Sequence, residues 1–430
     1  MNWRCLFLSL VICSFHLAAL AAQDTSAVKV EIVESGSGFQ LLRDGTPYEI
    51  RGAGLEYGDI SSLALHGGNA IRNWTTDDAL QVLDTAHAHG VTVALCLPMQ
   101  PERHGFDYSD PEAVAEQLSL MREEVLKYKD HPALLAWIIG NELNFDYSNS
   151  AVYDAVNDVS KMIHELDPNH PTTTTVAGIG EDVLSDLESR ASDLDFLSFQ
   201  VYGEVFNLQN FLRYNEFERP VWITEWGAIG HWEMESTDWG APIEMTSTEK
   251  ANVYQRAFDE VLTPLEGKVI GTFAFLWGQK QERTPTWFGM FTELGEETET
   301  VDVMHRIWTG QWPTNRSPIL ETLLLDGKSA RQNIELVVSE SYQAEVDMLD
   351  PDGDDIDYRW EIKTESTSQQ VGGDRETPIV NVQSDVSTIN SSSVEFAAPD
   401  SPGAYRLFVY GFDGNNHAAH ANIPFLVTGK

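Results

Sequence analysis

The sequence is poor in cysteine and in basic residues. Only three of its 430 residues are cysteines, and two of these, Cys5 and Cys13, lie in an apolar N-terminal segment. Cys96 stands alone in the rest of the chain, so no intramolecular disulfide is expected there, and its apolar surroundings favour a packing role. The 27 Lys and Arg residues face 67 Asp and Glu residues, for a formal net charge of -40. Such an acidic surface repels phosphate backbones, which excludes a nucleic-acid partner.

Several motifs are also missing, and each absence excludes a class of function. After the N-terminal segment, no apolar run is long enough to span a membrane. No G-x-G-x-x-G follows the first expected strand, and no G-x-S-x-G elbow occurs. No histidine pair has metal-ligand spacing, so a zinc site is not expected. We therefore predict no cofactor and no metal.

Residues 1–22 resemble an export signal. Arg4 supplies a basic region, the stretch from Leu6 to Leu20 is mostly apolar, and Ala19-Leu20-Ala21 has the small-x-small pattern of a cleavage site. A membrane anchor is the alternative, but the apolar run is shorter than the roughly 20 residues that a bilayer needs. The segment predicts a secreted protein, whether periplasmic, at the cell surface or extracellular.

Residues 23–313 alternate short apolar runs with longer amphipathic ones, which is typical of βα units on a parallel sheet. A hairpin is expected first, over Val28 to Ile50. Eight parallel strands then follow: Ile50–Leu55, Ala70–Asn73, Val91–Pro98, Leu134–Asn141, Thr172–Ala177, Phe196–Tyr202, Val221–Glu225 and Val269–Trp277. This predicts a (β/α)8 TIM barrel, in preference to an open doubly wound sheet.

Two segments between these strands carry clear helix signals. Asp110-Pro111 combines a capping residue with a first-turn proline. A second helix is expected over Thr76 to His89, with Leu80, Leu83 and Ala86 facing inward.

Residues 318–430 have a different pattern, with short alternating strands and Asp/Gly/Ser-rich turns. The expected strands are Ile334–Val338, Gln343–Met348, Ile356–Ile362, Val394–Ala397, Ala404–Gly411 and Ile423–Val427. They predict a C-terminal all-β immunoglobulin-like sandwich. The turn from Asp350 to Asp355 could hold calcium, but it lacks the twelve-residue calcium-loop pattern and a solvated turn is favoured.

Two carboxylates end strands of the expected barrel. Glu142 follows the fourth strand in Ile139-Gly140-Asn141-Glu142, and Glu225 ends the seventh. Side chains at the carboxyl ends of barrel strands face one mouth. Cleavage of a glycosidic bond needs two carboxyl groups there, one protonated and one ionised. The pair therefore predicts a glycoside hydrolase.

These residues resemble the catalytic signature of the clan A glycoside hydrolases, which are retaining TIM-barrel enzymes. The resemblance implies that Glu142 is the acid/base, that Glu225 is the nucleophile and that Asn141 binds the sugar 2-hydroxyl. The stretch from His131-Pro132 to Trp137 is similar to family 2 and family 5 members. The spacing of the two glutamates and the appended sandwich look most like family 158, the endo-β-1,3-glucanases.

The same resemblance implies roles for other strand ends. Arg72 would keep the nucleophile ionised, Tyr202 would hydrogen-bond it, and Trp277 would form an aromatic floor for the sugar. Trp226 and Trp287 lie in or near the mouth loops, where a tryptophan can stack on a sugar ring or serve as a packing anchor. We count all five among the substrate-binding candidates.

The expected function is that of a secreted retaining β-glycosidase with a polysaccharide substrate, most similar to an endo-β-1,3-glucanase (laminarinase). The same chemistry on β-1,4-glucan, mannan or galactan is an alternative, and so is transglycosylation. A non-catalytic carbohydrate-binding protein is the alternative from another class. A retaining mechanism predicts carboxyl groups about 5–5.5 Å apart.

Overall fold

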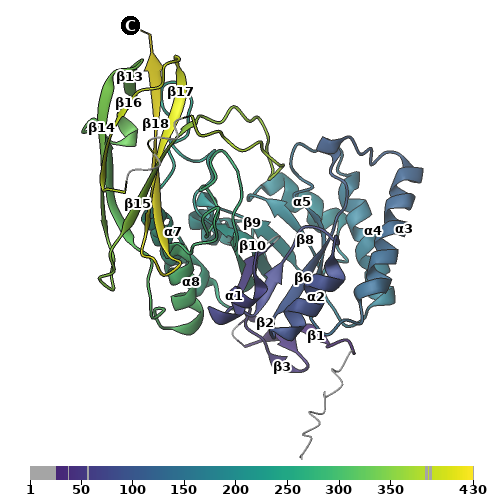
Figure 1. The fold of residues 1–430 in the computed structure, drawn as a ribbon. Helices are drawn as coiled ribbons and strands as arrows, with labels where there is room; N and C mark the ends of the chain where they lie inside the picture. The colour runs from purple at the N-terminus through teal and green to yellow at the C-terminus, as the bar shows by residue number, and fades with distance from the viewer. Residues whose placement is uncertain (1–25, 37, 56–57, 383–385, 387–389, 430) are drawn as a thin grey trace, which may run out of the picture.

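The computed structural model describes residues 26–36, 38–55, 58–382, 386 and 390–429 (Figure 1). The expected signal segment, residues 1–22, lies outside the described residues. The described chain forms a barrel with helices around it and, beside the barrel, an upright pair of β-sheets (Figure 1). The boundaries of the two expected domains, 23–313 and 318–430, stay predictions.

The eight expected parallel strands close into a barrel, which confirms the predicted fold class. Each strand is hydrogen-bonded to its neighbours in chain order, and the last strand, β11, pairs with the first, β4. The observed strands are β4 (Gly52–Gly54), β5 (Ala70–Arg72), β6 (Thr92–Leu97), β7 (Leu134–Asn141), β8 (Thr172–Ala177), β9 (Leu197–Gln200), β10 (Val221–Gly227) and β11 (Val269–Phe275).

Helices follow the strands and cover the outside of the barrel. They are α1 (Ile60–Leu65), α2 (Ala79–Ala88), α3 (Pro111–Tyr128), α4 (Ala151–Leu166), α5 (Glu181–Arg190), α6 (Leu208–Tyr214), α7 (Ser247–Ala257) and α8 (Glu299–Thr309). Short helical turns are η1 (Glu102–His104), η2 (Gly203–Asn207), η3 (Phe258–Leu262), η4 (Thr263–Leu265) and η5 (Ala330–Gln332). In the described residues, none of these helices has the length and apolar character needed to cross a membrane.

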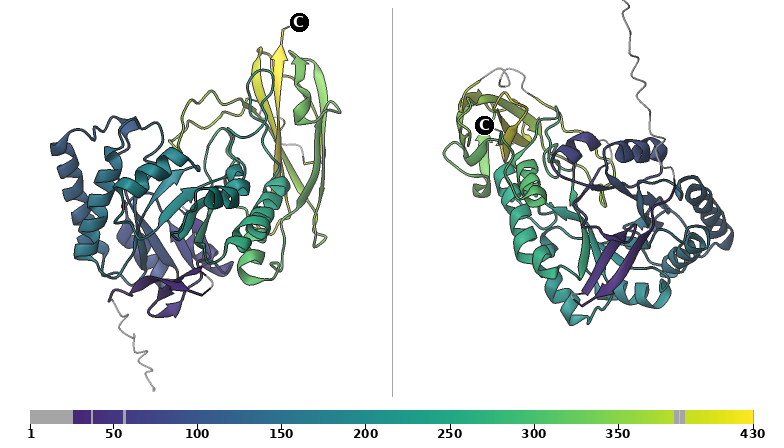
Figure 2. Two further views of the ribbon diagram at one scale, coloured as in Figure 1. Left: turned by 180° about the vertical axis from the view of Figure 1, so that it is seen from behind. Right: turned by 90° about the horizontal axis from the view of Figure 1, so that it is seen from below.

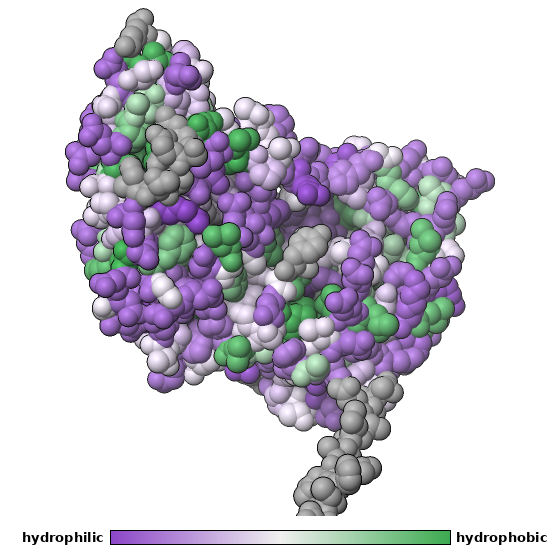
Figure 3. All heavy atoms as spheres, in the orientation of Figure 1, coloured by the Kyte–Doolittle hydropathy of each residue, from purple (hydrophilic) through white to green (hydrophobic). Residues whose placement is uncertain are grey.

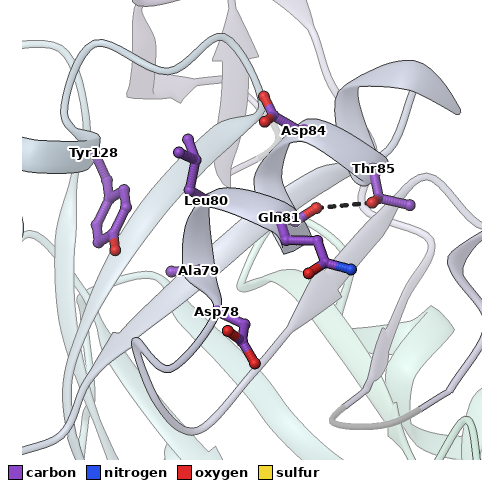
Figure 4. Close-up of a pocket in the computed structure, with 7 residues that line it drawn as sticks. All are labelled: Asp78, Ala79, Leu80, Gln81, Asp84, Thr85 and Tyr128. Carbon is purple, nitrogen blue, oxygen red and sulfur yellow. Dashed lines mark hydrogen bonds between the residues drawn. The ribbon is translucent and has the colours of Figure 1, made fainter.

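One inward-facing residue of α2 was predicted wrongly. Leu83 and Ala86 are fully buried, but Leu80 is 56% exposed. Leu80 lies one residue after Ala79, which takes the buried position of the first turn, so Leu80 points into a shallow hollow shared with Tyr128 (Figure 4). The buried stripe of this short helix therefore runs through Ala79, Leu83 and Ala86, at the spacing of one helix face.

A small antiparallel sheet covers the amino-terminal end of the barrel. It contains β1 (Val30–Ser35), β2 (Gly38–Arg43) and β3 (Thr46–Pro47). The Val30 backbone donates to the Asn169 carbonyl before β8, and Phe39 donates to the Gly267 carbonyl before β11. From below, this sheet is seen to cross the end of the barrel (Figure 2). The floor is therefore covered, and the opposite end is left for a site.

The inside of the barrel is packed with side chains rather than hollow. Val30 and Leu41 of the small sheet join strand residues such as Ile138 and Trp222 in one buried cluster. Cys96 belongs to it and is fully buried, which confirms the packing role expected from its sequence. Burial raises the pKa of the Cys96 thiol to about 11, so the group is not a reactive thiolate at neutral pH.

The C-terminal strands form two sheets around a shared core, as expected for a sandwich. One sheet has the order β12-β14-β16 and the other β13-β18-β17-β15. The strands are β12 (Ile319–Leu325), β13 (Ile334–Val337), β14 (Ser341–Leu349), β15 (Asp357–Thr364), β16 (Ser393–Ala397), β17 (Gly403–Phe412) and β18 (Ala418–Thr428). The first strand, β12, was not predicted as a strand.

The sandwich packs directly against the barrel. In Figure 2 the yellow strands stand beside the green helices α7 and α8. Leu407 and Val409 of β17 face the sandwich core, whereas the alternate residue Arg406 donates to the Pro242 carbonyl at 2.9 Å. The neighbouring strand β18 also contacts the barrel domain, because the backbone N–H of His420 donates to Ser247 Oγ of α7 at 3.0 Å. This sheet is thus covered on both faces.

Candidate active site

A cavity of about 860 Å³ opens at the carboxyl ends of the barrel strands. Both Glu142 and Glu225 line it, together with residues from the ends of seven strands or from the loops that follow them. Among its other lining residues are Trp74, Arg103, Asn141, Phe145, Gln200, Tyr202, His231, Trp232, Phe275, Lys280 and Glu282. The two carboxylates thus share one solvent-accessible space.

Glu225 is held by four hydrogen-bond donors. Arg72 Nη1 lies 2.8 Å, Trp74 Nε1 2.9 Å and Gln200 Nε2 2.6 Å from its Oε1 atom. Its Oε2 atom accepts from the Tyr202 hydroxyl at 2.6 Å. The donors fix the orientation of a carboxylate that is 5% exposed, as a nucleophile aimed at one atom requires.

Arg72 pairs the charge of Glu225. Its guanidinium is fully buried and also donates to Asn141 Oδ1 at 3.0 Å and to the Asn73 carbonyl. It lies over the Trp74 ring, 4.4 Å from the centroid. A planar fork with several fixed donors suits this place better than the single ammonium of a lysine.

Glu142 lies in the same cavity in different surroundings. Burial raises its pKa, the charge of Glu225 raises it further, and together they bring it to about 8. The chain turns sharply here, since Gly140 and Glu142 both have positive φ angles, 73° and 49°. A Cβ atom at Gly140 would lie 2.5 Å from Leu143, so this turn requires glycine.

Asn141 is bound by two of the residues that hold Glu225. Its Oδ1 atom accepts from Arg72 and from Gln200 Nε2, the latter at 2.9 Å. Because the oxygen is occupied by these donors, the amide nitrogen is the part of the side chain that can donate to a ligand. Asn141 also lines the cavity, together with Glu142 and Glu225.

Aromatic rings form another wall of the cavity. The Tyr202 ring lies edge-on to Trp232, with centroids 5.5 Å apart, and contacts Phe275 and Phe288. Trp232 is 58% exposed and therefore offers a free ring surface. Burial and the charge of Glu225 keep the pKa of Tyr202 well above 10, so its hydroxyl is a donor.

The three predicted tryptophans do not reach the cavity, which corrects their assignment as substrate-binding residues. Trp226, Trp277 and Trp287 are each no more than 1% exposed and are absent from the cavity wall. Successive strand residues point to opposite faces, so Trp226 packs outward on Tyr254 of α7 while Glu225 points inward. Trp277 packs on Trp308 of α8, and Trp287 donates to the Ile229 carbonyl.

Trp74 and Gln200 were missed by the sequence reasoning, although both contact Glu225. Each follows or ends a strand, so the criterion that selected Arg72 and Tyr202 could have found them. Arg103, on the loop after β6, was missed as well. Its Nη1 atom lies 3.4 Å from the Glu142 carbonyl oxygen, a contact that no local pattern signals.

A charged cluster lies on the β11 side of the cavity. Glu282 forms ion pairs with Lys280 at 2.9 Å and with His231 at 3.5 Å. Burial opposes ionisation of Glu282, but the bond to His231 and the Lys280 charge outweigh it and lower its pKa. Burial opposes the charge of Lys280, but the charge and hydrogen bond of Glu282 outweigh it and, with smaller contributions from Glu225 and Glu142, raise the pKa of Lys280.

Three carboxylates on the sandwich come together outside the cavity. Asp350, Asp354 and Asp413 bring oxygens within 4.8 Å of one another. These carboxylates already accept hydrogen bonds: Asp350 from two backbone N–H groups of its own turn, and Asp413 from those of Asn415 and His417. The arrangement is that of an Asp-rich turn, and none of the three residues lines the cavity.

The hollow beside α2 offers no comparable chemistry. Its volume is about 410 Å³, and Asp78, Gln81 and Asp84 lie on its surface (Figure 4). The one hydrogen bond drawn there joins Thr85 Oγ1 to the Gln81 carbonyl within the helix (Figure 4). Asp84 is already paired with His131 at 3.2 Å, so we assign no site there.

The barrel segment matches a known family. Residues 59–260 match the description "Glycosyl hydrolases family 2, TIM barrel domain". The matched segment contains Arg72, Asn141, Glu142, Tyr202 and Glu225. The match supports the resemblance to clan A glycosidases. It gives no support to the narrower resemblance to family 158.

Shorter matches connect the chain to fungal mannanases. The sequence is 35% identical over 80 residues to mannan endo-1,4-beta-mannosidase F of Aspergillus clavatus, which is 18% of each chain. It is 27% identical over 118 residues to the Aspergillus fumigatus protein of the same name, or 24% of this chain and 27% of that one. The chain thus matches under a third of the length of these curated relatives.

Solved structures show the same fold. Bacteroides uniformis beta-glucuronidase 2 aligns with 93% of this chain and 48% of its own, at 14% identity and a TM-score of 0.52. Bifidobacterium dentium beta-glucuronidase aligns with 66% of this chain and 49% of its own, at 19% identity and a TM-score of 0.53. At such identities the likeness concerns the fold, and the first alignment includes β-sheets beyond the barrel.

Proposed function

We propose that the protein is a retaining β-glycoside hydrolase that acts on a polysaccharide. The observation that carries this proposal is that Glu142 and Glu225 share one cavity in opposite electrostatic surroundings. Glu225 faces a guanidinium and three other donors, whereas the pKa of Glu142 is raised to about 8. One carboxylate suited to attack and one acid suited to donate a proton are the two parts of a double displacement.

The first step breaks the glycosidic bond. A Glu225 oxygen attacks the anomeric carbon while Glu142 protonates the departing oxygen, which leaves a covalent glycosyl-enzyme. Glu142, now ionised, takes a proton from water, and that water releases the sugar with the original anomeric configuration. The Asn141 amide donates to the sugar 2-hydroxyl, and Arg72 and Tyr202 hold Glu225 in line.

Two polysaccharides are the first substrates to test. The spacing of the glutamates and the appended sandwich favour a β-1,3-glucan such as laminarin, attacked within the chain. The matches to fungal mannan endo-1,4-beta-mannosidases favour a β-1,4-mannan. Both choices use the same chemistry, as would β-1,4-glucan or galactan, and a sugar in place of water would give transglycosylation. The resemblance of residues 1–22 to an export signal supports a location of this activity outside the cytoplasm.

The test is hydrolysis of a panel containing laminarin, mannan, β-1,4-glucan, xylan and galactan, with products separated by size. We expect cleavage of at least one glycan. The anomeric configuration of the first product, measured by NMR, should be the same as that of the substrate. Glu225→Gln removes the nucleophile and should abolish turnover, and Glu142→Gln should lower it by about 10²–10⁴-fold on substrates with poor leaving groups.

Glu188→Gln is the matched control, because Glu188 is exposed on α5 and should leave the rate unchanged. Full activity of Glu225→Gln on every glycan that the wild type cleaves would contradict the proposed mechanism. Binding of a glycan without release of reducing ends would instead support a non-catalytic binding protein.

A further inference from the structure

The sandwich contributes part of the cavity wall. Between β15, which ends at Thr364, and β16, which begins at Ser393, the chain leaves the sandwich and extends toward the barrel mouth (Figure 1). Val371, Gly372 and Gly373 of this connection line the same cavity as the two glutamates. We refer to residues 368–376 as the sandwich loop.

One side of the sandwich loop is bound to the loop after β6. Arg103 Nη2 donates to the Gly372 carbonyl at 3.3 Å and pairs with Asp374 at 3.4 Å. His104 Nε2 lies 3.1 Å from the other Asp374 oxygen. The same Arg103 side chain reaches the Glu142 carbonyl through its second nitrogen. A single guanidinium therefore connects the sandwich loop to the backbone of the proposed acid.

The other side is bound to the loop after β11. Arg283 donates through its guanidinium to the Ser368 and Gln370 carbonyls, and its backbone N–H donates to Glu376 Oε2 at 2.7 Å. Glu376 is 4% exposed and also forms an ion pair with Arg283 at 3.4 Å. Contacts at both ends fix the loop in place across the mouth, so it forms a wall and not a free surface segment.

The backbone of the loop favours glycine where it approaches the site. Gly372 and Gly373 have φ angles of 61° and 77°, and a Cβ atom on them would lie 3.1 Å from the Arg103 guanidinium and from Lys280 Nζ, respectively. Val371, the residue before them, is 40% exposed and presents an apolar side chain to the cavity. Apolar side chains pack against the C–H faces of sugar rings.

From these contacts we propose that the sandwich loop is a substrate-binding wall, with Val371 as a specificity-determining residue. It contacts a sugar next to the one attacked by Glu225, and so favours an extended β-linked chain over a short one. This inference rests on the proposed glycosidase function. It assigns to the C-terminal sandwich a part in substrate selection in addition to packing against the barrel.

The test compares Val371→Asp with the wild type on two substrates from the active glycan class: the polysaccharide, and the shortest oligosaccharide that the wild type cleaves. We expect kcat/KM on the polysaccharide to fall about tenfold, because a charge replaces an apolar sugar contact. On the short substrate it should change less than twofold. Val371 is 40% exposed, so we expect the variant to fold as the wild type does, and circular dichroism checks this.

Val380→Asp is the matched control. Val380 belongs to the same connection and is 64% exposed, but it does not line the cavity, so both rates should stay unchanged. An equal change on both substrates, or none on either, would overturn the role of the loop while leaving the proposed chemistry intact. A wild type that cleaves no glycan would instead remove the proposed function, and the inference with it.

Discussion

At the scale of single residues, two glutamates of the same chemistry differ because of what surrounds them. Glu225 receives four donors, one of them the buried Arg72 guanidinium. The Glu142 side chain accepts from none of these four donors, and burial and the charge of Glu225 raise its pKa. A fixed charge beside a buried acid is an efficient way to keep that acid protonated at neutral pH.

This difference predicts an alkaline limit to activity. The acid must be protonated to act, so kcat/KM should fall as the pH rises through the pKa of Glu142, about 8. The measurement is a pH profile on an oligosaccharide that the wild type cleaves, because its leaving group needs the proton of Glu142. Glu142→Gln cannot ionise, so it should lose the alkaline limb on this substrate. Persistence of the same limb in the variant would assign it to another group.

At the scale of elements, local sequence signals position the strands and helices that carry the site. Helix α3 illustrates this at its start, where Asp110 Oδ1 accepts from the backbone N–H groups of Glu112 and Ala113 and Pro111 fills the first turn. The cap satisfies donors that the first turn leaves without partners. The helix so begun covers the outside of the barrel and does not line the cavity.

Removal of this cap should lower stability and leave catalysis alone. Asp110→Ala should reduce the free energy of unfolding by about 1 kcal/mol, measured by urea denaturation. Glu116→Ala on the same exposed helix surface is the control and should stay within about 0.5 kcal/mol of the wild type. A loss of glycosidase activity in Asp110→Ala under conditions where the variant is fully folded would show that α3 contributes to the site.

At the scale of the whole molecule, a buried polar network joins barrel and sandwich. Glu244, after β10, pairs with Lys250 of α7 at 2.5 Å and accepts from Asn422 of β18 at 2.6 Å. It also accepts from Thr284 and Thr286. The face of the molecule drawn in Figure 3 is largely hydrophilic, in line with the net charge of -40. The interface between barrel and sandwich therefore depends on hydrogen-bonded polar groups as well as on apolar packing.

Breaking this network should destabilise the protein strongly. Glu244→Ala leaves the buried Lys250 ammonium without its partner, which should cost about 3–5 kcal/mol in unfolding free energy. The control is Glu235→Ala, which breaks the exposed Glu235–Arg331 pair across the same boundary and should cost no more than about 1 kcal/mol. Equal losses would show that burial of the pair is not decisive.

The same carboxylate predicts how stability depends on acid. Burial opposes ionisation of Glu244, but Lys250 and His420 outweigh it and hold its pKa at about 2. A folded-state pKa below the unfolded value of about 4.5 means that the stabilisation is complete above pH 4.5 and is lost as the pH falls toward 2. Glu244→Gln should show a flatter stability curve in this window.

Most of the barrel could be predicted because its signals are local. Apolar runs of strand length, helix caps and strand-end residues all lie within a few positions of one another in the chain. They placed Arg72, Asn141, Glu142, Tyr202 and Glu225 at one end of a parallel barrel, and the structure brings these five together. Their roles in catalysis stay predictions until the variants are measured.

The tertiary structure alone decided the rest. Trp226, Trp277 and Trp287 are excluded from the cavity because helices α7 and α8 and the mouth loops cover them, and no local pattern encodes what packs behind a strand. The sandwich loop reaches the mouth through Arg103 and Arg283, each more than 80 residues away from it in sequence. Sequence periodicity reports which side of an element is buried, but only long-range packing determines which distant segment covers it.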